Sequence, residues 1–311
     1  MIRVGDSLFA TGVVHNAAYG GIDHDAVSTV RKLALMPHLD VVEAAWPLEP
    51  DVRQPLQVIM KDVGATAIHA AGGQMRQKGI NPNSLDRQER AQALFWLEQI
   101  VAAVSDMGAK LLVLCSGPDC LPNDRDEAKK YLHEMLCILC QRAKELRPED
   151  PLWISFEHFD RELDQKRLLG PTSETVDFIR SVRKDVPNIG VLADLSHLVQ
   201  LGETISQSID AIGDLLIHAH VANCGLDPAY PAVYGDSHCR FGVEGSAVTL
   251  THVIEFLSAL DRNGLAKRAL PTGHAVISVE MKTPKGGDPE ISIANGLRML
   301  YQASAAISST R

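Results

Sequence analysis

Eight short apolar runs recur along the chain, and a polar loop followed by a stretch of helical periodicity comes after most of them. The runs cover residues 7–13, 39–46, 65–70, 110–116, 152–159, 189–195, 215–222 and 275–282. Strands that alternate with helices pair in parallel through crossover connections, and eight such strands close a (β/α)8 barrel. The alternation therefore predicts an α/β fold, and the closed barrel is the arrangement that we favour.

An open doubly wound sheet is the alternative arrangement. However, no run is followed by the G-x-G-x-x-G turn with which such sheets bind dinucleotides. Helical periodicity is clearest at residues 86–106, 126–146, 172–184, 249–263 and 289–306. We expect Thr172 or Ser173 to cap the third of these helices, with Glu174 in its first turn, and Gly264 to end the fourth.

The composition is that of a folded globular chain, with 45% hydrophobic and 22% charged residues among 311. Two average domains would fit this length, but no Pro-, Gly- or Ser-rich linker divides the chain, and one α/β barrel uses about 250 residues. We therefore expect a single TIM-barrel domain over residues 1–311. The 30 Lys and Arg residues against 39 Asp and Glu give a net charge of −9, which disfavours nucleic acid as a partner.

The N-terminal sequence has no basic segment followed by an apolar core, and no apolar run approaches the roughly 18 residues of a membrane span. These features predict a cytoplasmic protein without a membrane partner. Six cysteines are too few for a disulfide scaffold. Cys137 and Cys140 fall inside an amphipathic helical stretch, and we expect them on its buried face.

Alternation within the last four runs indicates where chemistry lies, because functional residues of a barrel project inward from the C-terminal ends of its strands. Each predicted inward face ends in an acidic or imidazole side chain. These faces are Trp153, Ser155 and Glu157; Gly190, Leu192 and Asp194; Leu216, His218 and His220; and Val276, Ser278 and Glu280. The last residue of each set is therefore expected at a common point.

Three carboxylates at one barrel mouth would repel one another unless a positive charge lies among them, and a divalent cation supplies that charge most economically. Three carboxylates and one imidazole form a mostly hard oxygen set. Such a set suits manganese, magnesium or cobalt better than structural zinc, although zinc stays an alternative. In the other interpretation, each residue is paired separately with a nearby Arg or Lys.

Four motifs in the second half of the chain resemble those of the xylose isomerase-like TIM-barrel superfamily. They are Ile154-Ser-Phe-Glu157-His158, Leu192-Ala-Asp194-Leu-Ser-His197, His218-Ala-His220-Val-Ala-Asn223-Cys and Ile277-Ser-Val-Glu280-Met-Lys282. That superfamily holds sugar isomerases and epimerases, inosose dehydratases and zinc AP endonucleases.

The resemblance implies that Glu157, Asp194, His220 and Glu280 are metal ligands, and that His197 binds substrate or a further metal. In the isomerase and epimerase branch, the residues that match Glu157 and Glu280 are also the catalytic acid and base.

The long loop after the seventh run holds further candidates for binding substrate. Its Asp236-x-His238 pair resembles the extra metal ligands of the zinc AP endonucleases, but the fourth run ends in Cys115-Ser-Gly without the histidine of those enzymes. Arg240, in the same loop, is a candidate for binding a carboxylate or phosphate, and its alternative is a surface arginine. Lys282 shares the face of Glu280 and is a candidate for steadying an oxyanion, or else for an ion pair.

Other residues have two interpretations each. His158 is expected to bind substrate only if its strand has already ended, since it has the opposite alternation to Glu157. His218 lies one layer deeper than His220, so we expect a hydrogen-bonded core histidine. His69 is either a further metal ligand or a buried barrel histidine. Trp46 is either a wall of a sugar pocket or, more commonly for tryptophan, part of the core.

Together, the sequence predicts a metal-dependent isomerase or epimerase of a small sugar or related polyhydroxy carbonyl compound, active in carbohydrate metabolism. A cation bridging a carbonyl and its neighbouring hydroxyl would acidify the carbon between them, and Glu157 and Glu280 would move the proton through a metal-bound enediolate. The alternatives are a lyase or dehydratase acting on a cyclitol or keto-sugar, a multinuclear zinc phosphodiesterase, and a non-catalytic sugar-binding barrel. The resemblance also agrees with a homo-oligomer, either a dimer or a tetramer.

Overall fold

Eight parallel strands form a closed barrel in the computed structural model, which describes residues 1–20, 22 and 24–309. The barrel strands are β2 (Ser7–Val14), β3 (Val41–Ala44), β4 (Thr66–Ala70), β5 (Leu111–Cys115), β6 (Trp153–Glu157), β7 (Ile189–Asp194), β8 (Leu216–Val221) and β9 (Val276–Val279). Each pairs with the next in chain order, and β2 also pairs with β9, so the sheet has no open edge between its first and last barrel strands. The prediction of a (β/α)8 TIM barrel built from all eight runs is confirmed.

A ninth strand, β1 (Ile2–Val4), was not expected from the sequence. It pairs antiparallel with the start of β2 through a tight turn in which Gly5 has a φ of 58°, a conformation that glycine adopts without strain. Only three residues long, β1 is too short to show an alternating pattern. It lies against the C-terminal helix, where Ser304 donates a hydrogen bond to the carbonyl of Arg3.

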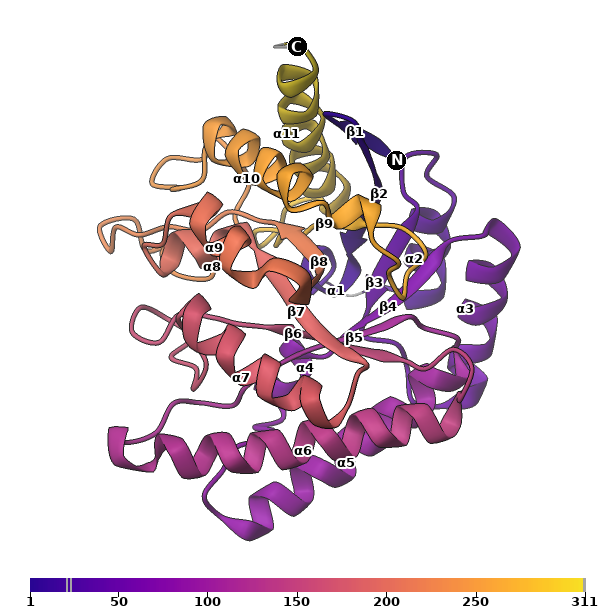
Figure 1. The fold of residues 1–311 in the computed structure, drawn as a ribbon. Helices are drawn as coiled ribbons and strands as arrows, with labels where there is room; N and C mark the ends of the chain where they lie inside the picture. Colours follow the sequence, from indigo (N-terminus) through magenta and orange to yellow (C-terminus); the bar gives the residue numbers. More distant parts are fainter. Residues whose placement is uncertain (21, 23, 310–311) are drawn as a thin grey trace.

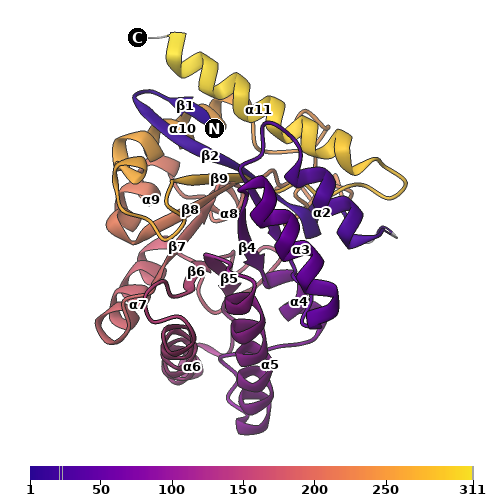
Figure 2. The same ribbon diagram turned by 90° about the vertical axis from the view of Figure 1, so that its right-hand side faces the viewer.

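Helices surround the strands, as Figures 1 and 2 show. The helices of the described residues are α1 (His15–Ala18), α2 (Ala26–Ala34), α3 (Pro50–Val63), α4 (Gly72–Gln77), α5 (Arg87–Asp106), α6 (Arg125–Leu146), α7 (Thr172–Asp185), α8 (Leu195–Gln200), α9 (Ile205–Ile212), α10 (Leu250–Asn263) and α11 (Pro289–Ser309). Short 3-10 turns cover Pro122–Asp124, Gly213–Leu215 and Leu265–Lys267. Within the part of the chain that is described, no helix has the length and apolarity needed to cross a bilayer.

The five predicted helices are α5, α6, α7, α10 and α11, but the predicted cap of α7 is wrong. Pro171 occupies the N-cap position, and neither Thr172 nor Ser173 caps the helix. The Thr172 hydroxyl donates to the carboxylate of Glu203 instead. Gly264 ends α10 as expected, with a left-handed φ of 74°. In α6, Cys140 is buried and Cys137 is half-buried.

The alternation predicted for β8 is wrong at Leu216, because a bulge shifts the register between β7 and β8. Leu216 packs in the core between strands and helices, whereas Ile217 packs inside the barrel with Leu192 and Val276. The bulge requires Gly190 on β7, since a Cβ there would lie 2.7 Å from both the Cγ2 atom of Ile217 and the carbonyl oxygen of Leu215. Beyond the bulge, His218 and His220 face the interior as predicted.

Candidate metal centre and substrate pocket

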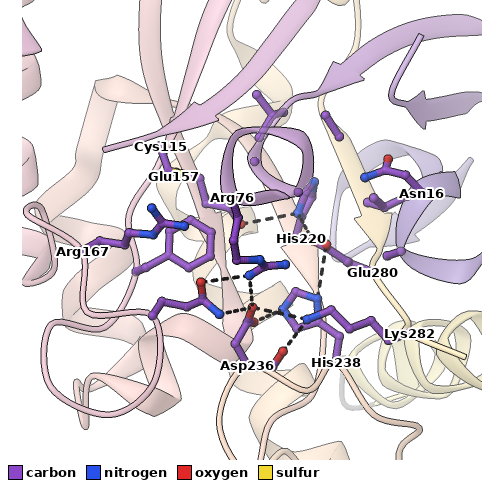
Figure 3. A pocket seen from close by; sticks show the side chains of 18 residues that line it. Asn16, Arg76, Cys115, Glu157, Arg167, His220, Asp236, His238, Glu280 and Lys282 are labelled. Atoms are coloured by element: carbon purple, nitrogen blue, oxygen red, sulfur yellow. Dashed lines mark hydrogen bonds and ion pairs between the residues drawn. The ribbon is translucent and has the colours of Figure 1, made fainter. Parts of the chain in front are cut away.

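The four predicted metal ligands meet at the C-terminal ends of neighbouring strands. Glu157, Asp194 and His220 lie on β6, β7 and β8, and Glu280 directly follows β9. One ligand atom from each lies within 4.8 Å of the others. His220 Nδ1 is 2.9 Å from Glu280 Oε2, 3.7 Å from Asp194 Oδ2 and 3.9 Å from Glu157 Oε1. Figure 3 shows Glu157, His220 and Glu280 converging on one side of the pocket.

The donor atoms of this cluster fit a divalent cation. Among the described residues, Glu157 Oε1, Asp194 Oδ2 and His220 Nδ1 are buried atoms without a hydrogen-bond partner. Asp194 uses its other oxygen, Oδ1, to accept hydrogen bonds of 2.6 Å from the backbone N–H and hydroxyl of Ser196, so Oδ2 is left free for the centre. Buried polar atoms are normally satisfied, and buried charges are normally paired or bound to a metal. Three potential metal-ligand atoms that lack hydrogen-bond partners in one buried cluster therefore indicate a cation site.

Glu43 on β3 supports the centre from inside the barrel and was missed in the sequence. It is fully buried, and its two oxygens accept hydrogen bonds from His218 Nε2 at 2.7 Å and His220 Nε2 at 3.0 Å. This arrangement holds Nδ1 of His220 toward the other three ligands. Burial alone would raise the pKa of Glu43, but the two imidazoles outweigh it and hold that pKa well below its ordinary value. His218 is the hydrogen-bonded core histidine that the sequence predicts.

The two predicted acid/base carboxyl groups lie in different electrostatic surroundings. Burial raises the pKa of Glu157 above its ordinary value. Burial also opposes ionisation of Glu280, but His238 and His220 outweigh it and hold the pKa of Glu280 well below the usual range. A contact of 3.2 Å joins His238 Nδ1 to Glu280 Oε1.

Three further predicted residues, His197, Asp236 and His238, border the centre. His197 Nε2 is 3.3 Å from Glu157 Oε1, and the centroid of its ring lies 4.1 Å from that of Phe159, with the two rings tilted by 46°. His238 Nε2 is 2.6 Å from Asp236 Oδ1. Burial would lower the pKa of His238, but Asp236 and Glu280 outweigh it and raise that pKa to about 10.

His197 and His238 also form, with Asp194, a second group whose donor atoms lie within 4.8 Å of one another.

A cavity of about 100 Å³ opens above Glu157, His220 and Glu280. Asp236, His238 and Lys282 line it, as Figure 3 shows, and Lys282 Nζ donates a hydrogen bond to the backbone carbonyl of Asp236. Cys115, at the end of β5, lines the cavity too, together with side chains that the sequence did not single out, among them Asn16, Arg76, Gln165 and Arg167. Asn16 lies on α1, Arg76 on α4, and Gln165 and Arg167 in the loop after β6, so local sequence does not reveal that they meet.

Three predicted substrate-binding residues do not line this cavity: His197, which borders the centre through Glu157, and His158 and Arg240, which lie farther away. His158 is buried behind it, 3.0 Å from the hydroxyl of Thr172, and burial lowers its pKa to about 4. The alternation argument explains this, because His158 points to the opposite side from Glu157. Arg240 lines a separate groove with Phe241 and Arg298. The structure therefore does not bring His158 or Arg240 to the candidate centre.

His69 and Trp46 are both buried core residues, which is one of the two alternatives that the sequence left for each. The backbone N–H of Trp46 donates to His69 Nδ1 at 3.2 Å, and the indole N–H donates to the carbonyl of Ile68 at 2.8 Å. Both side chains are buried inside the molecule. His69 is therefore a barrel histidine rather than a fifth member of the candidate metal centre.

Solved structures share this fold across nearly the whole chain. A D-tagatose 3-epimerase-like protein superimposes with a TM-score of 0.71 at 16% identity, covering 97% of this chain and 99% of its own. D-Psicose 3-epimerase from Clostridium cellulolyticum H10 gives 0.66 at 18% identity, covering 97% and 98%. The 3-keto-D-glucoside 4-epimerase from E. coli gives 0.66 at 14% identity, covering 97% and 100%.

No curated protein matches the chain in sequence. The family model described as xylose isomerase-like TIM barrel matches residues 34–303. That range contains all four residues of the candidate metal centre and every barrel strand except β2. The chain therefore belongs to the xylose isomerase-like TIM barrel family.

Proposed function

We propose that this protein is a divalent-metal-dependent isomerase or epimerase of a small sugar or related polyhydroxy carbonyl compound. The observation that carries the proposal is the cluster of Glu157, Asp194, His220 and Glu280, with three buried donor atoms left without partners among the described residues. The family and the sugar epimerases that share the fold support the same class of reaction. The oxygen-rich donor set favours manganese, magnesium or cobalt, with zinc as the alternative.

Asp194 and His220 are the anchoring ligands in this proposal, since they lie on the two central strands of the four and are fixed by Ser196 and Glu43. A bound cation would stabilise negative charge on substrate oxygens as a proton leaves the neighbouring carbon. Glu157 and Glu280 are the acid and base. They lie at the ends of β6 and β9, with β7 and β8 between them, so their carboxylates face the cavity from different sides. Removal of a proton by one and return by the other requires that placement.

The test is entry of solvent deuterium at the carbon beside the carbonyl of a ketose, measured by NMR on metal-loaded protein. Glu157→Gln and Glu280→Gln keep the side-chain shape and an oxygen ligand but remove the basic site. We expect each to slow exchange by about 10²-fold or more. Glu149→Gln, at an exposed glutamate beyond α6, is the matched control and is expected to exchange at the wild-type rate. Near wild-type exchange in both site variants would contradict the acid/base assignment.

The products of the same reaction separate the alternatives. A lyase or dehydratase would exchange the proton and then lose water, which changes the product mass. A non-catalytic sugar-binding barrel would bind metal and sugar without any exchange.

The second group, of Asp194, His197 and His238, favours a multinuclear phosphodiesterase. Against it stands Cys115, which lies at the end of β5, where the zinc AP endonucleases place a histidine. A metal count per chain and an abasic-DNA cleavage assay decide between the two functions.

A further inference from the structure

The loop that follows β6 is built around a buried carboxylate. Asp160 is 2% exposed, and its two oxygens accept hydrogen bonds from the backbone N–H groups of Asp164 at 2.8 Å and Gln165 at 2.9 Å. Its carbonyl accepts a further bond from the N–H of Arg167 at 3.0 Å. These three bonds fold the chain from Asp160 to Arg167 back on itself, so the start and end of the loop are joined.

The same loop is fixed to the end of β5. The N–H of Leu168 donates to the carbonyl of Gly117 at 3.1 Å, and the N–H of Leu169 donates to the Ser116 hydroxyl at 3.1 Å. On its other side Gly117 packs against the chain after α4, where a Cβ would lie 1.9 Å from Asn81 Oδ1. Arg167 is therefore held in place before any ligand arrives.

Arg167 is a nearly buried cation that pairs with no anion of the described residues. It is 6% exposed, yet the only side-chain hydrogen bond that it makes to a described residue is a long one of 3.4 Å from NH1 to the carbonyl of Ser116, and its Nε has no partner there. No ion pair within residues 1–20, 22 and 24–309 includes it. By contrast, its neighbour Arg161 pairs with Glu174.

The other cations of the pocket already have an anionic partner. Arg76 NH1 is 3.7 Å from Asp236 Oδ2, and Lys282 Nζ is 3.4 Å from the same oxygen. Cys115 does not compensate Arg167 either, because burial raises the pKa of its thiol and keeps it neutral. Isolated charges are rarely buried unless a partner or ligand pairs with them. Arg167 is thus the one cation lining this cavity, within the described chain, that lacks an anion.

The position of Arg167 indicates where such an anion would lie. Arg167 lines both the cavity of the candidate metal centre and a neighbouring groove of about 600 Å³, and these two spaces also share Arg76 and Gln165. Figure 3 shows the guanidinium extending from its loop into the pocket on the side away from Lys282. A ligand whose reacting carbon lies beside Glu157 and Glu280 would pass Arg167 on its way into the groove.

We propose that Arg167 binds a carboxylate or phosphate group of the substrate, so that this protein acts on an anionic sugar derivative rather than a neutral sugar. The planar guanidinium pairs with two oxygens of either anion at once. The inference rests on the proposed function and narrows its substrate class.

Three ketoses that differ only at C6 test the proposal, namely D-fructose, D-fructose 6-phosphate and D-fructuronate. Their affinities for metal-loaded wild type, Arg167→Gln and the control Arg180→Gln, at an exposed arginine of α7, are measured by calorimetry. We expect one charged ketose to bind about 10- to 100-fold more tightly than D-fructose to wild type and control, and to lose this advantage in Arg167→Gln. The charged ketose that binds more tightly distinguishes phosphate from carboxylate.

Two results would overturn the proposal: no advantage of either charged ketose in wild type, or an advantage that persists in Arg167→Gln. Because affinity does not require turnover, these results are distinct from a failure of deuterium exchange, which would contradict the proposed function itself.

The melting temperature of the ligand-free protein is a second measurement. It separates a role of Arg167 in substrate binding from a role in holding the loop together, because only the second role predicts that the substitution lowers it. Removing an uncompensated buried charge is expected to leave the melting temperature of Arg167→Gln at or above the wild-type value. A fall of several degrees relative to Arg180→Gln would assign Arg167 to the structure of the loop and overturn the proposal.

Discussion

Glu43, His218 and His220 form a buried stack of ionisable groups that runs from the barrel interior to the candidate metal centre. Glu43 accepts hydrogen bonds from both imidazoles, which fixes the tautomer of His220 and the direction of its Nδ1. A free imidazole on a strand end would rotate among several orientations. The carboxylate removes that freedom before a metal binds.

We predict that Glu43→Gln lowers the affinity of the protein for Mn²⁺ by about 10- to 100-fold, because the amide no longer carries the charge that orients and polarises His220. Calorimetric titration of metal-free protein measures this, with Glu149→Gln as the control. Circular dichroism verifies that the variant is folded. A folded Glu43→Gln protein with wild-type affinity would show that Glu43 serves only the packing of the barrel.

His69 gives the protein a pH-dependent stability that is separate from the candidate metal centre. Its Nδ1 accepts the N–H of Trp46, and burial lowers its pKa from 6.5 to about 4. The folded state therefore keeps the ring neutral at pH values where the unfolded chain binds a proton. The contribution of His69 to the free energy of unfolding is therefore fully present above pH 6.5 and is lost as the pH falls toward 4. At pH 5 the loss from this residue is about 2 kcal/mol.

The variant His69→Asn keeps an acceptor for the N–H of Trp46 but has no imidazole to protonate. We predict that, between pH 7.5 and pH 5, the free energy of unfolding falls by about 2 kcal/mol less in this variant than in wild type. Urea unfolding at the two pH values measures the difference. Equal losses in the two proteins would mean that His69 is not neutral in the folded state at pH 5.

At the scale of the elements, the bulge in β8 depends on the absence of a side chain in β7. Gly190 leaves room for Ile217 inside the barrel, and the register after the bulge places His220 opposite Asp194. The simple alternation of the sequence is correct for the outward residues of β6, such as Ile154 and Phe156, but it fails at Leu216. A bulge arises from contact between two strands, so one strand's sequence does not reveal it.

We predict that Gly190→Ala destabilises the protein by about 1–3 kcal/mol, since the new methyl group meets both Ile217 and the backbone carbonyl of Leu215. Gly72→Ala is the control, because a Cβ at that position meets no atom within 4 Å. Urea unfolding compares the two variants with wild type. A Gly190→Ala protein as stable as wild type would show that β8 does not need this space.

The sequence predicts the strands and the candidate metal cluster better than it predicts the residues around them, because the first depend on local patterns and the second on contacts between distant segments. Apolar runs and alternation are local, so all eight barrel strands and the side chains at their ends are readable. Glu43 stands in an apolar strand 175 residues before His218, and nothing nearby in the sequence indicates that pairing. Arg167 is similar, because its lack of a counter-charge becomes visible only when the loop around Asp160 is folded.

At the scale of the whole molecule, the candidate centre joins the second half of the barrel to the first. Its four candidate ligands lie on β6, β7 and β8 and directly after β9, β9 pairs with β2, and Glu43 links the candidate centre to β3. A ligand that binds only this assembled state stabilises the whole fold by mass action.

We predict that removing divalent metal with a chelator lowers the melting temperature of the wild type, and that added Mn²⁺ restores it. At a metal concentration about 100 times the dissociation constant, the stabilisation is about 2.7 kcal/mol. His220→Ala should melt at the same temperature with and without Mn²⁺. Differential scanning calorimetry makes the comparison, and an equal Mn²⁺ response in both proteins would place the stabilising ion elsewhere.

The claim that a divalent cation binds at the cluster of Glu157, Asp194, His220 and Glu280 can be tested without a substrate, by titration of Mn²⁺ into metal-free protein, which counts the bound ions. We predict about one strongly bound ion per chain in the wild type, and loss of that binding in both Asp194→Ala and His220→Ala. Strong binding that is unchanged in both variants, or the absence of strong binding in the wild type, would contradict the claim.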